Sequence, residues 1–196
     1  MDAERLPAGV SAESFAQAII RGGATLLQYR NKTQPGRAVL AEAEAIKRGA
    51  ALHSNITLIM NDRADLCVAV GFGGVHLGQD DLSPRGARRL CPAPLLVGIS
   101  THHPAQVAAA DREPVDYIAI GPVFATASKA KADPVVGLDG VREARKLTSK
   151  SLVAIGGITR ANCRAVMDAG ADSVAVIAEL LHDPHKTTEE FMRILG

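Results

Sequence analysis

Short apolar runs alternate with helix-forming segments along the whole chain, and this alternation limits the possible folds. Seven apolar runs begin near residues 24, 56, 73, 95, 115, 151 and 173, and a helical pattern follows each of them. Strands that are joined by helices form parallel sheets with right-handed crossovers. The sequence therefore predicts an α/β fold, a (β/α) barrel in one domain over residues 1–196. A doubly wound open sheet is the alternative.

The number of strands does not match a complete barrel. A (β/α)8 TIM-type barrel has eight strands, whereas the chain supplies seven and begins with a predicted helix over residues 12–21. We therefore expect the barrel to lack its first strand in this chain. We also expect the authentic product to carry a short hydrophobic strand of roughly five residues before Asp2. Closure with seven strands, or pairing of an open edge with another subunit, is the alternative.

Composition narrows the classes of partner. The 196 residues are 47% hydrophobic and 22% charged, with a net charge of +1 and 3% aromatic residues. This balance favours neither nucleic acid nor a membrane surface, and it provides few rings for stacking on bases. The sequence shows no membrane-spanning run and no secretory leader, and its three scattered cysteines suit a reduced compartment. We expect a cytoplasmic protein with small-molecule substrates, and the sequence leaves open whether it forms a homo-oligomer.

Polar residues follow the apolar runs, at the carboxyl ends of the predicted strands, where barrels bind their ligands. After the first run, Arg30 and Lys32 alternate with Tyr29 and Asn31. Both cations can therefore point inward from one strand end and neutralise a multiply charged ligand. For any single residue, the alternative is a solvated loop position.

Two carboxylates lie at neighbouring strand ends. Asp62 follows the second run and Asp81 follows the third. Beside cations that bind phosphate, two such carboxylates suit Mg2+, which takes its other ligands from substrate phosphates. Zinc is disfavoured because the cysteines and histidines lack ligand spacing. Surface carboxylates or helix caps are the alternative.

Two further stretches resemble anion sites. The run over residues 115–120 stops at Gly121-Pro122 and is followed by small residues with Thr126, Ser128 and Lys129, a composition that suits a phosphate cradle. Gly156-Gly157 and the backbone after Ile177 follow the last two strands, where barrels often bind a monophosphate.

Together these features predict a diphosphate site and a monophosphate site. The sequence shows no strong nucleophile, and for His102 a structural role is favoured over that of a general base. Because a diphosphate leaving group needs only charge neutralisation, the residues predict substitution at a carbon that bears diphosphate.

Six motifs in order resemble the thiamine phosphate synthase family: QYRNK (28–32), NDR (61–63), GVHLGQDD (74–81), GIS (98–100), GPVFATASK (121–129) and AIGGI (154–158). The resemblance implies the (β/α)8 barrel and a condensation of a hydroxymethylpyrimidine diphosphate with a thiazole phosphate. The products implied are thiamine phosphate and diphosphate. The mechanism implied is dissociative, with a pyrimidine methyl cation that the thiazole nitrogen captures.

The resemblance also implies the roles of individual residues. Asp62 and Asp81 would hold Mg2+, and Arg30, Lys32 and Lys129 would be the catalytic cations. The pyrimidine diphosphate would be bound by Gln28, Tyr29, Arg30, Asn31, Lys32, Asn61, Ser100 and Lys129. The thiazole phosphate would be bound by Thr126, Ala127, Ser128, Gly157, Ile177 and Ala178.

The sequence departs from the family pattern at two of these positions. Ala178 stands where the family usually has Ser, which removes one hydroxyl, and Ser128 replaces the usual Thr. A thiazole tautomerase resembles the chain less, because Pro122 stands where that relative has His. An inactive, truncated binding barrel is the non-enzymatic alternative.

Overall fold

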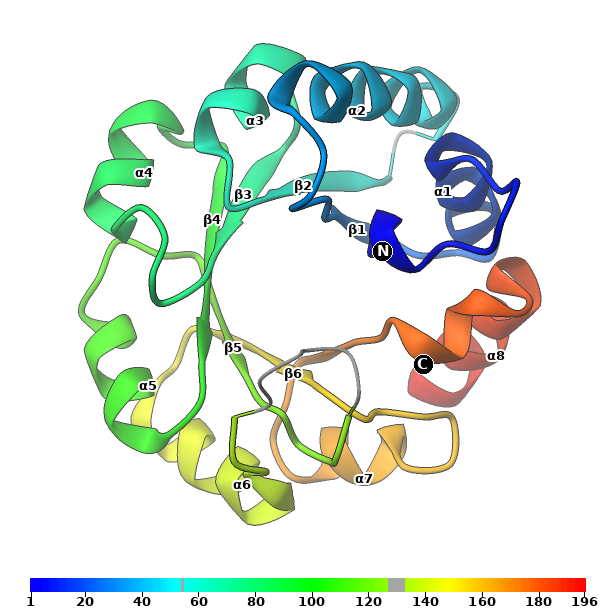
Figure 1. Ribbon diagram of the computed structural model, residues 1–196. Coiled ribbons are helices and arrows are strands. Elements are labelled where there is room, and N and C mark those ends of the chain that lie inside the picture. The colour runs from blue at the N-terminus through cyan, green and yellow to red at the C-terminus, as the bar shows by residue number, and fades with distance from the viewer. Residues whose placement is uncertain (54, 127–132) are drawn as a thin grey trace.

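In the computed structural model, which describes residues 1–53, 55–126 and 133–196, seven parallel strands pair in chain order. Figure 1 shows them around a central axis with the helices outside. The strands are β1 (Leu26–Tyr29), β2 (Thr57–Asn61), β3 (Gly74–Leu77), β4 (Leu96–Thr101), β5 (Tyr117–Ile120), β6 (Ser151–Ile155) and β7 (Ser173–Ala175). The helices are α1 (Ala12–Arg21), α2 (Gly36–Ala50), α3 (Ala64–Val70), α4 (Pro84–Leu90), α5 (Pro104–Asp111), α6 (Gly137–Leu147), α7 (Cys163–Asp168) and α8 (Pro184–Leu195), with 3-10 turns η1 (Ala3–Arg5) and η2 (Ala178–Leu181).

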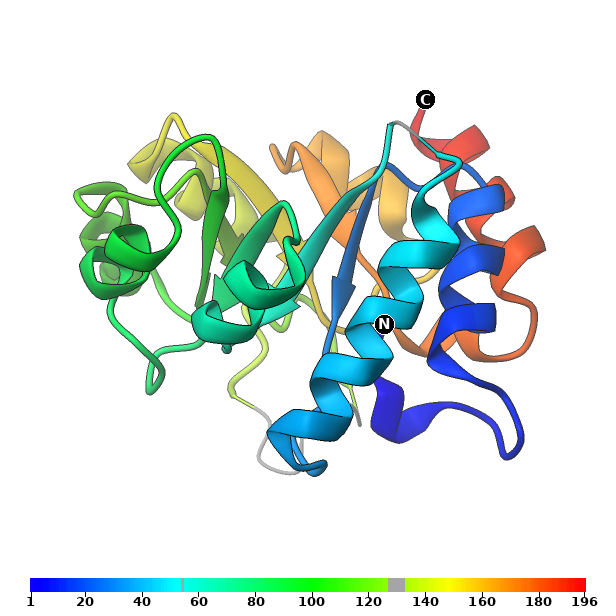
Figure 2. The same cartoon turned by 90° about the horizontal axis from the view of Figure 1, so that it is seen from above.

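The seven predicted strands are all present, and each pairs in parallel with the next. A doubly wound sheet reverses its strand order near the middle, whereas this order runs from β1 to β7 without reversal. The doubly wound alternative is therefore wrong. Outside the sheet, α1 packs against both α2 and α8, as Figure 2 shows.

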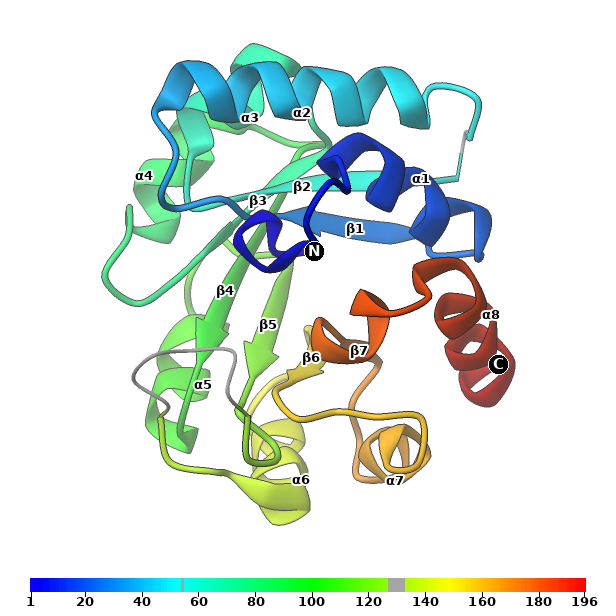
Figure 3. The ribbon, with the colours of Figure 1, turned by 45° about the vertical axis from the view of Figure 1, so that its right-hand side comes forward.

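The N-terminal residues lie beside β1, at one end of the sheet. Asp2 forms a parallel bridge with Arg30. The N–H of Ala3 donates to the Arg30 carbonyl at 2.8 Å, and the N–H of Arg30 donates to the Met1 carbonyl at 3.1 Å. Figure 3 shows this segment next to β1. The residues from Met1 to Ala3 therefore extend the sheet at the carboxyl end of β1.

The side chains that face the helices are apolar. Alternate residues of each strand point to this face, where burial stabilises the fold by about 1.5–3 kcal/mol for each large side chain. The buried residues of this layer include Leu27, Leu58, Val75, Val97, Ile118 and Leu152.

The opposite face of the sheet is polar at its centre. Register pairs Asn61 with His76, His76 with Gly98, and Gly98 with Tyr117, so these residues of β2 to β5 lie at one level. A Cβ at Gly98 would overlap the ring of Tyr117. The missing side chain of Gly98 therefore makes room for Tyr117 to lie across β4.

The residue types at Ser11, Asp183 and Thr159 predict three helix caps, of which the first two are confirmed and the third is wrong. Ser11 accepts from the N–H of Ser14 at 3.1 Å, and Asp183 accepts from the N–H of Lys186 at 3.1 Å. Thr159 does not cap α7, which begins only at Cys163. Instead, the N–H of Thr159 donates to the Asn162 side chain at 2.8 Å. That local bond replaces the expected first helical turn.

Two observations concern the reactivity of the cysteine thiols and the possibility that a helix spans a membrane. Cys67, Cys91 and Cys163 are buried and form no disulfide. Burial raises the pKa of the Cys67 thiol to about 12, which disfavours the reactive thiolate. Within the described ranges, every helix falls short of the length and apolar character that a membrane span requires.

We predict that Gly98→Ala destabilises the protein, because the added methyl group must displace the Tyr117 ring. Overpacking of this kind typically costs about 1–3 kcal/mol. Urea unfolding measures the free energy of unfolding, and Gly36→Ala is the matched control because its Cβ would meet only ordinary contacts at 3.6 Å. Equal stability of the two variants would contradict the close packing of Tyr117 over Gly98.

Candidate active site

Five polar side chains from neighbouring strands share the inner face of the sheet. Alternation along each strand and the register between strands place them there: Gln28 on β1, Asn61 on β2, His76 on β3, Ser100 on β4 and Tyr117 on β5. His76 and Tyr117 are each only 7% exposed. The structure therefore brings together Gln28, Asn61 and Ser100, which the sequence predicted, and adds two residues to them.

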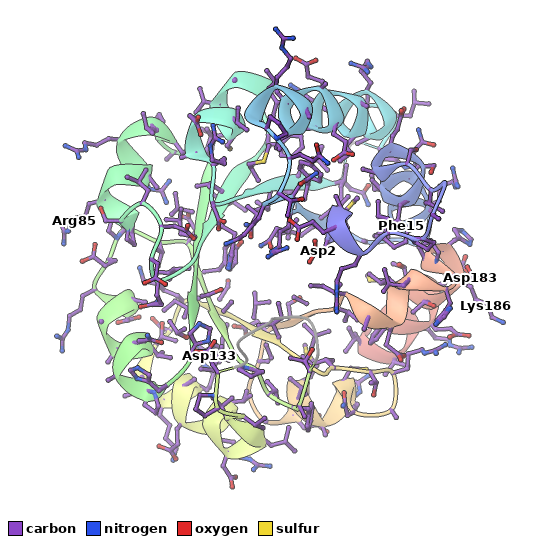
Figure 4. The ribbon with its side chains drawn as sticks, in the orientation of Figure 1. Asp2, Phe15, Arg85, Asp133, Asp183 and Lys186 are labelled. Atoms are coloured by element: carbon purple, nitrogen blue, oxygen red, sulfur yellow. The ribbon has the colours of Figure 1, made fainter. Side chains whose placement is uncertain are left out.

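Arg30 is held at the rim of this face by carboxylates from the N-terminal segment. Its guanidinium lies 2.9 Å from Asp2 and 3.4 Å from Glu4. Asp2 is 3% exposed, and Figure 4 shows it inside the ring of helices, whereas Arg85 and Lys186 point outward. A buried carboxylate thus fixes the direction of the Arg30 side chain.

Lys32, Asp62 and Asp81 form a second charged group. The ammonium of Lys32 lies 2.8 Å from the Asp62 carboxylate. The carboxyl groups of Asp62 and Asp81 are within hydrogen-bonding reach of each other, and the N–H of Gly78 donates to Asp81 at 2.8 Å. Burial raises the pKa of Asp62, Asp81 raises it further, and Lys32 acts in the opposite direction.

The paired carboxylates suit a divalent cation. Asp62 adopts a left-handed backbone with φ of 60°, a conformation that Asp tolerates better than most residues. A cation placed between two neighbouring carboxylates offsets the repulsion between their charges. Groups of three or more His, Cys, Asp or Glu with metal-site geometry are not found among the described residues. A bound cation would therefore need further oxygen ligands from water or from a substrate phosphate.

The structure does not bring Tyr29 and Asn31 to the inner face. Both point toward α2, where the Tyr29 hydroxyl and the Asn31 amide donate to the carboxylate of Glu42. Burial, followed by Glu42, raises the pKa of Tyr29. A cavity of about 230 Å³ lies beside Asn31, and its lining includes Glu4 and Glu42. Those two carboxylates disfavour a phosphate in this cavity.

The loops after β5 and β6 pack against each other. Gly156 and Gly157 have φ of 98° and 64°, a conformation that favours glycine. A Cβ at Gly156 would meet Pro122 at 2.6 Å, and one at Gly157 would meet the Ala125 carbonyl at 2.6 Å. The two glycines therefore allow the chain leading to Thr126 to lie directly against the β6 turn.

The segment after β7 joins this group. Ile177 is half-buried and precedes η2, which begins at the exposed Ala178. Arg160, in the loop after β6, pairs with Glu179 of η2 at 2.9 Å and with Glu190 of α8. The Arg160 pairs thus link the Gly157 turn to η2, at the strand ends where the sequence predicted a monophosphate.

The sequence analysis also considered four residues that follow β4 and β5 in the chain: His102, Ala127, Ser128 and Lys129. His102 donates from its Nδ1 atom to the Gly121 carbonyl at 2.6 Å, and its Nε2 atom lies 3.5 Å from Asp133. These contacts agree with the structural role favoured for His102. Ala127, Ser128 and Lys129 lie outside the described residues.

Sequence reasoning missed His76 and Tyr117 as site residues. Both lie within apolar runs, GVHLG and VDYIAI, where a single polar residue is easily assigned to the core. The available signal was the glycine in LLVGI, which lies between them in the sheet.

Comparisons by family model, by sequence and by structure all match this chain to proteins named for thiamine phosphate synthesis. A family model described as thiamine monophosphate synthase matches residues 4–180. A thiamine-phosphate synthase from Koribacter versatilis (strain Ellin345) is 59% identical, over 96% of this chain and 89% of the relative. One from Chloroflexus aurantiacus is 43% identical, over 90% and 81%. The solved structure of a thiamine phosphate pyrophosphorylase from Pyrococcus furiosus superposes with a TM-score of 0.86 at 31% identity, and the match covers 95% of this chain and 90% of that one.

We predict that Asp81→Asn stabilises the metal-free protein slightly at neutral pH, on the order of 0.5 kcal/mol, because it removes a charge that opposes Asp62. The folded-state pKa of Asp62 is raised, so its contribution to stability is full below the ordinary carboxyl pKa. That contribution is lost as pH rises through the raised value. Thermal unfolding between pH 4 and 8 measures this loss, which should shrink in Asp81→Asn.

The same variant tests cation binding. Added Mg2+ should raise the melting temperature of the wild type, because a ligand that binds only the folded state stabilises it. The increase should be lost in Asp62→Asn and Asp81→Asn. Asp80→Asn, which changes an exposed neighbouring carboxylate, should retain it. An unchanged increase in all three variants would place the cation elsewhere.

Proposed function

The chain belongs to the thiamine monophosphate synthase family, and on this premise we propose that it is a thiamine-phosphate synthase. It joins 4-amino-2-methyl-5-hydroxymethylpyrimidine diphosphate to 4-methyl-5-(2-hydroxyethyl)thiazole phosphate and releases diphosphate. The observation that carries this proposal is the grouping of Arg30, Lys32, Asp62 and Asp81 at the rim of a polar inner face. Cations and a carboxylate pair at one rim suit a diphosphate with its metal ion.

We infer that residues 1–196 form one domain of the (β/α)8 type in which seven of the eight strand positions are filled by β1 to β7. The sequential parallel order supports this inference. Pairing of the segment from Met1 to Ala3 with Arg30 supports it as well, since that segment lies where the carboxyl end of a strand before β1 would lie.

In the proposed reaction, the bond between the pyrimidine methylene carbon and the diphosphate oxygen breaks first. The bonding electrons leave with diphosphate, whose growing charge Arg30, Lys32 and Lys129 neutralise. Gln28, Asn61 and Ser100 hold the pyrimidine. The lone pair of the thiazole nitrogen then forms the new C–N bond to the methylene carbon. Asp62 and Asp81 would hold Mg2+, which when bound supplies additional positive charge at the diphosphate.

The thiazole phosphate occupies the other side of the site. We assign its phosphate to the turn at Gly157 and to the backbone at Ile177 and Ala178, and the family resemblance adds Thr126, Ala127 and Ser128 as further ligands. The ion pairs of Arg160 with Glu179 and Glu190 support this assignment, because they link the loop after β6 to η2, the two segments whose backbone N–H groups would bind the phosphate. Ala178 provides an N–H but no hydroxyl for this purpose.

Two other functions make different predictions. A thiazole tautomerase would act on the thiazole alone, and the carboxylate pair at Asp62 and Asp81 argues against it because that reaction needs no diphosphate-bound metal. A non-catalytic barrel would bind ligands without releasing diphosphate.

Purified protein with Mg2+ and both substrates should form thiamine phosphate and diphosphate in equal amounts. Chromatography and a diphosphate assay measure the two products. Omission of the thiazole phosphate should suppress diphosphate release. Equal release with and without it would identify a hydrolase instead, and no release with both substrates would favour the binding barrel.

We predict that Arg30→Ala and Lys32→Ala each lower kcat by roughly a hundredfold, because removal of one donor from developing charge typically costs about 3 kcal/mol. Arg63→Ala is the matched control, since Arg63 is exposed and pairs with Asp65 at 2.6 Å. Its kcat should change by no more than about twofold. Similar losses in all three variants would indicate a general charge effect and would contradict the assigned roles.

A further inference from the structure

A chain of hydrogen bonds crosses the inner face of the sheet from β1 to β4. The Gln28 side chain is hydrogen-bonded to the Tyr117 hydroxyl. The Tyr117 hydroxyl lies 2.9 Å from Nδ1 of His76, and Nε2 of His76 lies 2.8 Å from the Ser100 hydroxyl. The two ends of this chain, Gln28 and Ser100, are the residues assigned above to the pyrimidine.

The middle of the chain is held rigidly. The rings of His76 and Tyr117 are stacked, with centroids 5.5 Å apart and planes at 23°. His76 and Tyr117 lie at one level on β3 and β5, and Gly98 of β4 lies between them. Because both rings are buried and Gly98 has no side chain, the rings meet directly across β4.

The direction of each hydrogen bond follows from its neighbours. Burial raises the pKa of Tyr117, so the phenol keeps its proton, and the Gln28 amide N–H donates to the phenol oxygen. The phenol proton is therefore donated to Nδ1 of His76. A neutral imidazole with an acceptor at Nδ1 carries its proton at Nε2. That Nε2–H donates to the Ser100 oxygen and leaves the Ser100 proton for a ligand.

We propose that His76 and Tyr117 are positioning residues that fix Ser100 as a hydrogen-bond donor and Gln28 as an acceptor toward the substrate ring. This assignment rests on the proposed function. A 4-aminopyrimidine presents a ring nitrogen that accepts and an amino group that donates, which matches Ser100 and Gln28. A 4-oxopyrimidine presents the reverse order, a carbonyl that accepts and an N–H that donates. This chain of hydrogen bonds, which we call the relay, thus makes the site selective for the amino form of the substrate.

The first test does not depend on catalysis. Long-range 1H–15N correlation spectra of histidine-labelled, ligand-free protein distinguish the two imidazole tautomers, and the His76 signal is assigned by its absence in His76→Gln. The wild type should show His76 with its proton at Nε2. Tyr117→Phe removes the hydroxyl that fixes this tautomer and should yield a mixture of forms. A wild-type His76 with its proton at Nδ1, or one that is doubly protonated at pH 7.5, would overturn the relay.

The second test measures selectivity. The ratio of kcat/KM for the 4-amino substrate to that for its 4-oxo analogue, both as diphosphates, should fall at least about tenfold in Tyr117→Phe and His76→Asn. The KM for the thiazole phosphate should remain unchanged. His76→Gln should retain more of the ratio than His76→Asn, because its amide can still donate to Ser100. Thr101→Val is the matched control, since it removes a buried hydroxyl on the helix-facing side of β4, and it should retain the wild-type ratio.

The outcomes separate the two proposals. If the wild type forms no thiamine phosphate, the proposed function fails, while the tautomer of His76 still decides the relay. If the wild type is active but Tyr117→Phe, folded by circular dichroism, keeps the full ratio, the positioning role is wrong. If a variant does not fold, the wild-type spectrum alone decides the direction of the hydrogen bonds.

Discussion

Seven parallel strands that pair without a slip in register determine which side chains meet on the inner face. Residues on neighbouring strands share a level only because each pairing continues the previous one, from Asn61 through His76 and Gly98 to Tyr117. A slip of one residue in any strand would exchange its inner and outer faces. It would bury the polar side chain against the helices and turn an apolar one inward. The chemistry of the inner face and the stability of the outer layer therefore depend on the same pairing.

The inner face is polar, but its buried groups are satisfied. Among the described residues, no buried side-chain nitrogen or oxygen lacks a hydrogen-bond partner. A buried polar group without a partner costs about 1–3 kcal/mol, so an unpaired His76 or Tyr117 would weaken the fold. Their contact removes this cost and leaves Gln28 and Ser100 as the polar groups at its two ends. Because these buried groups hydrogen-bond to one another, the inner face can support a ring-shaped ligand, and the folded protein loses no stability when the ligand is absent.

Much of the architecture could be predicted from local sequence patterns. The seven apolar runs gave the strands, and Ser11 and Asp183 capped their helices as expected. The Thr159 prediction failed because Asn162 offers a competing local hydrogen bond, which residue type alone does not reveal. The short contact between Lys32 and Asp62 joins ends of neighbouring strands, so their positions in the sequence already suggested it.

Contacts across several strands could not be predicted in the same way. His76 and Tyr117 are 41 residues apart, and their contact depends on the register of β3, β4 and β5 together. Asp2 meets Arg30 across 28 residues because the N-terminal segment lies beside β1. Tyr29 and Asn31 fit the sequence motif as well as Arg30 does, but alternation along the strand directs them to Glu42. A motif locates residues along the chain, whereas the pleat and the register decide which of them face a ligand.

The close approach of Tyr117 to Gly98 has a consequence for how this sequence can vary. The two positions share one volume, which the aromatic ring fills from β5 because β4 contributes only backbone there. Any side chain at position 98 requires a smaller residue at position 117, and a smaller residue at 117 leaves a void unless 98 is enlarged. Substitutions at these two positions are therefore tolerated jointly rather than singly. A redesigned barrel that exchanges them as a pair would shift the aromatic ring to the neighbouring strand and, with it, the side from which the imidazole is supported.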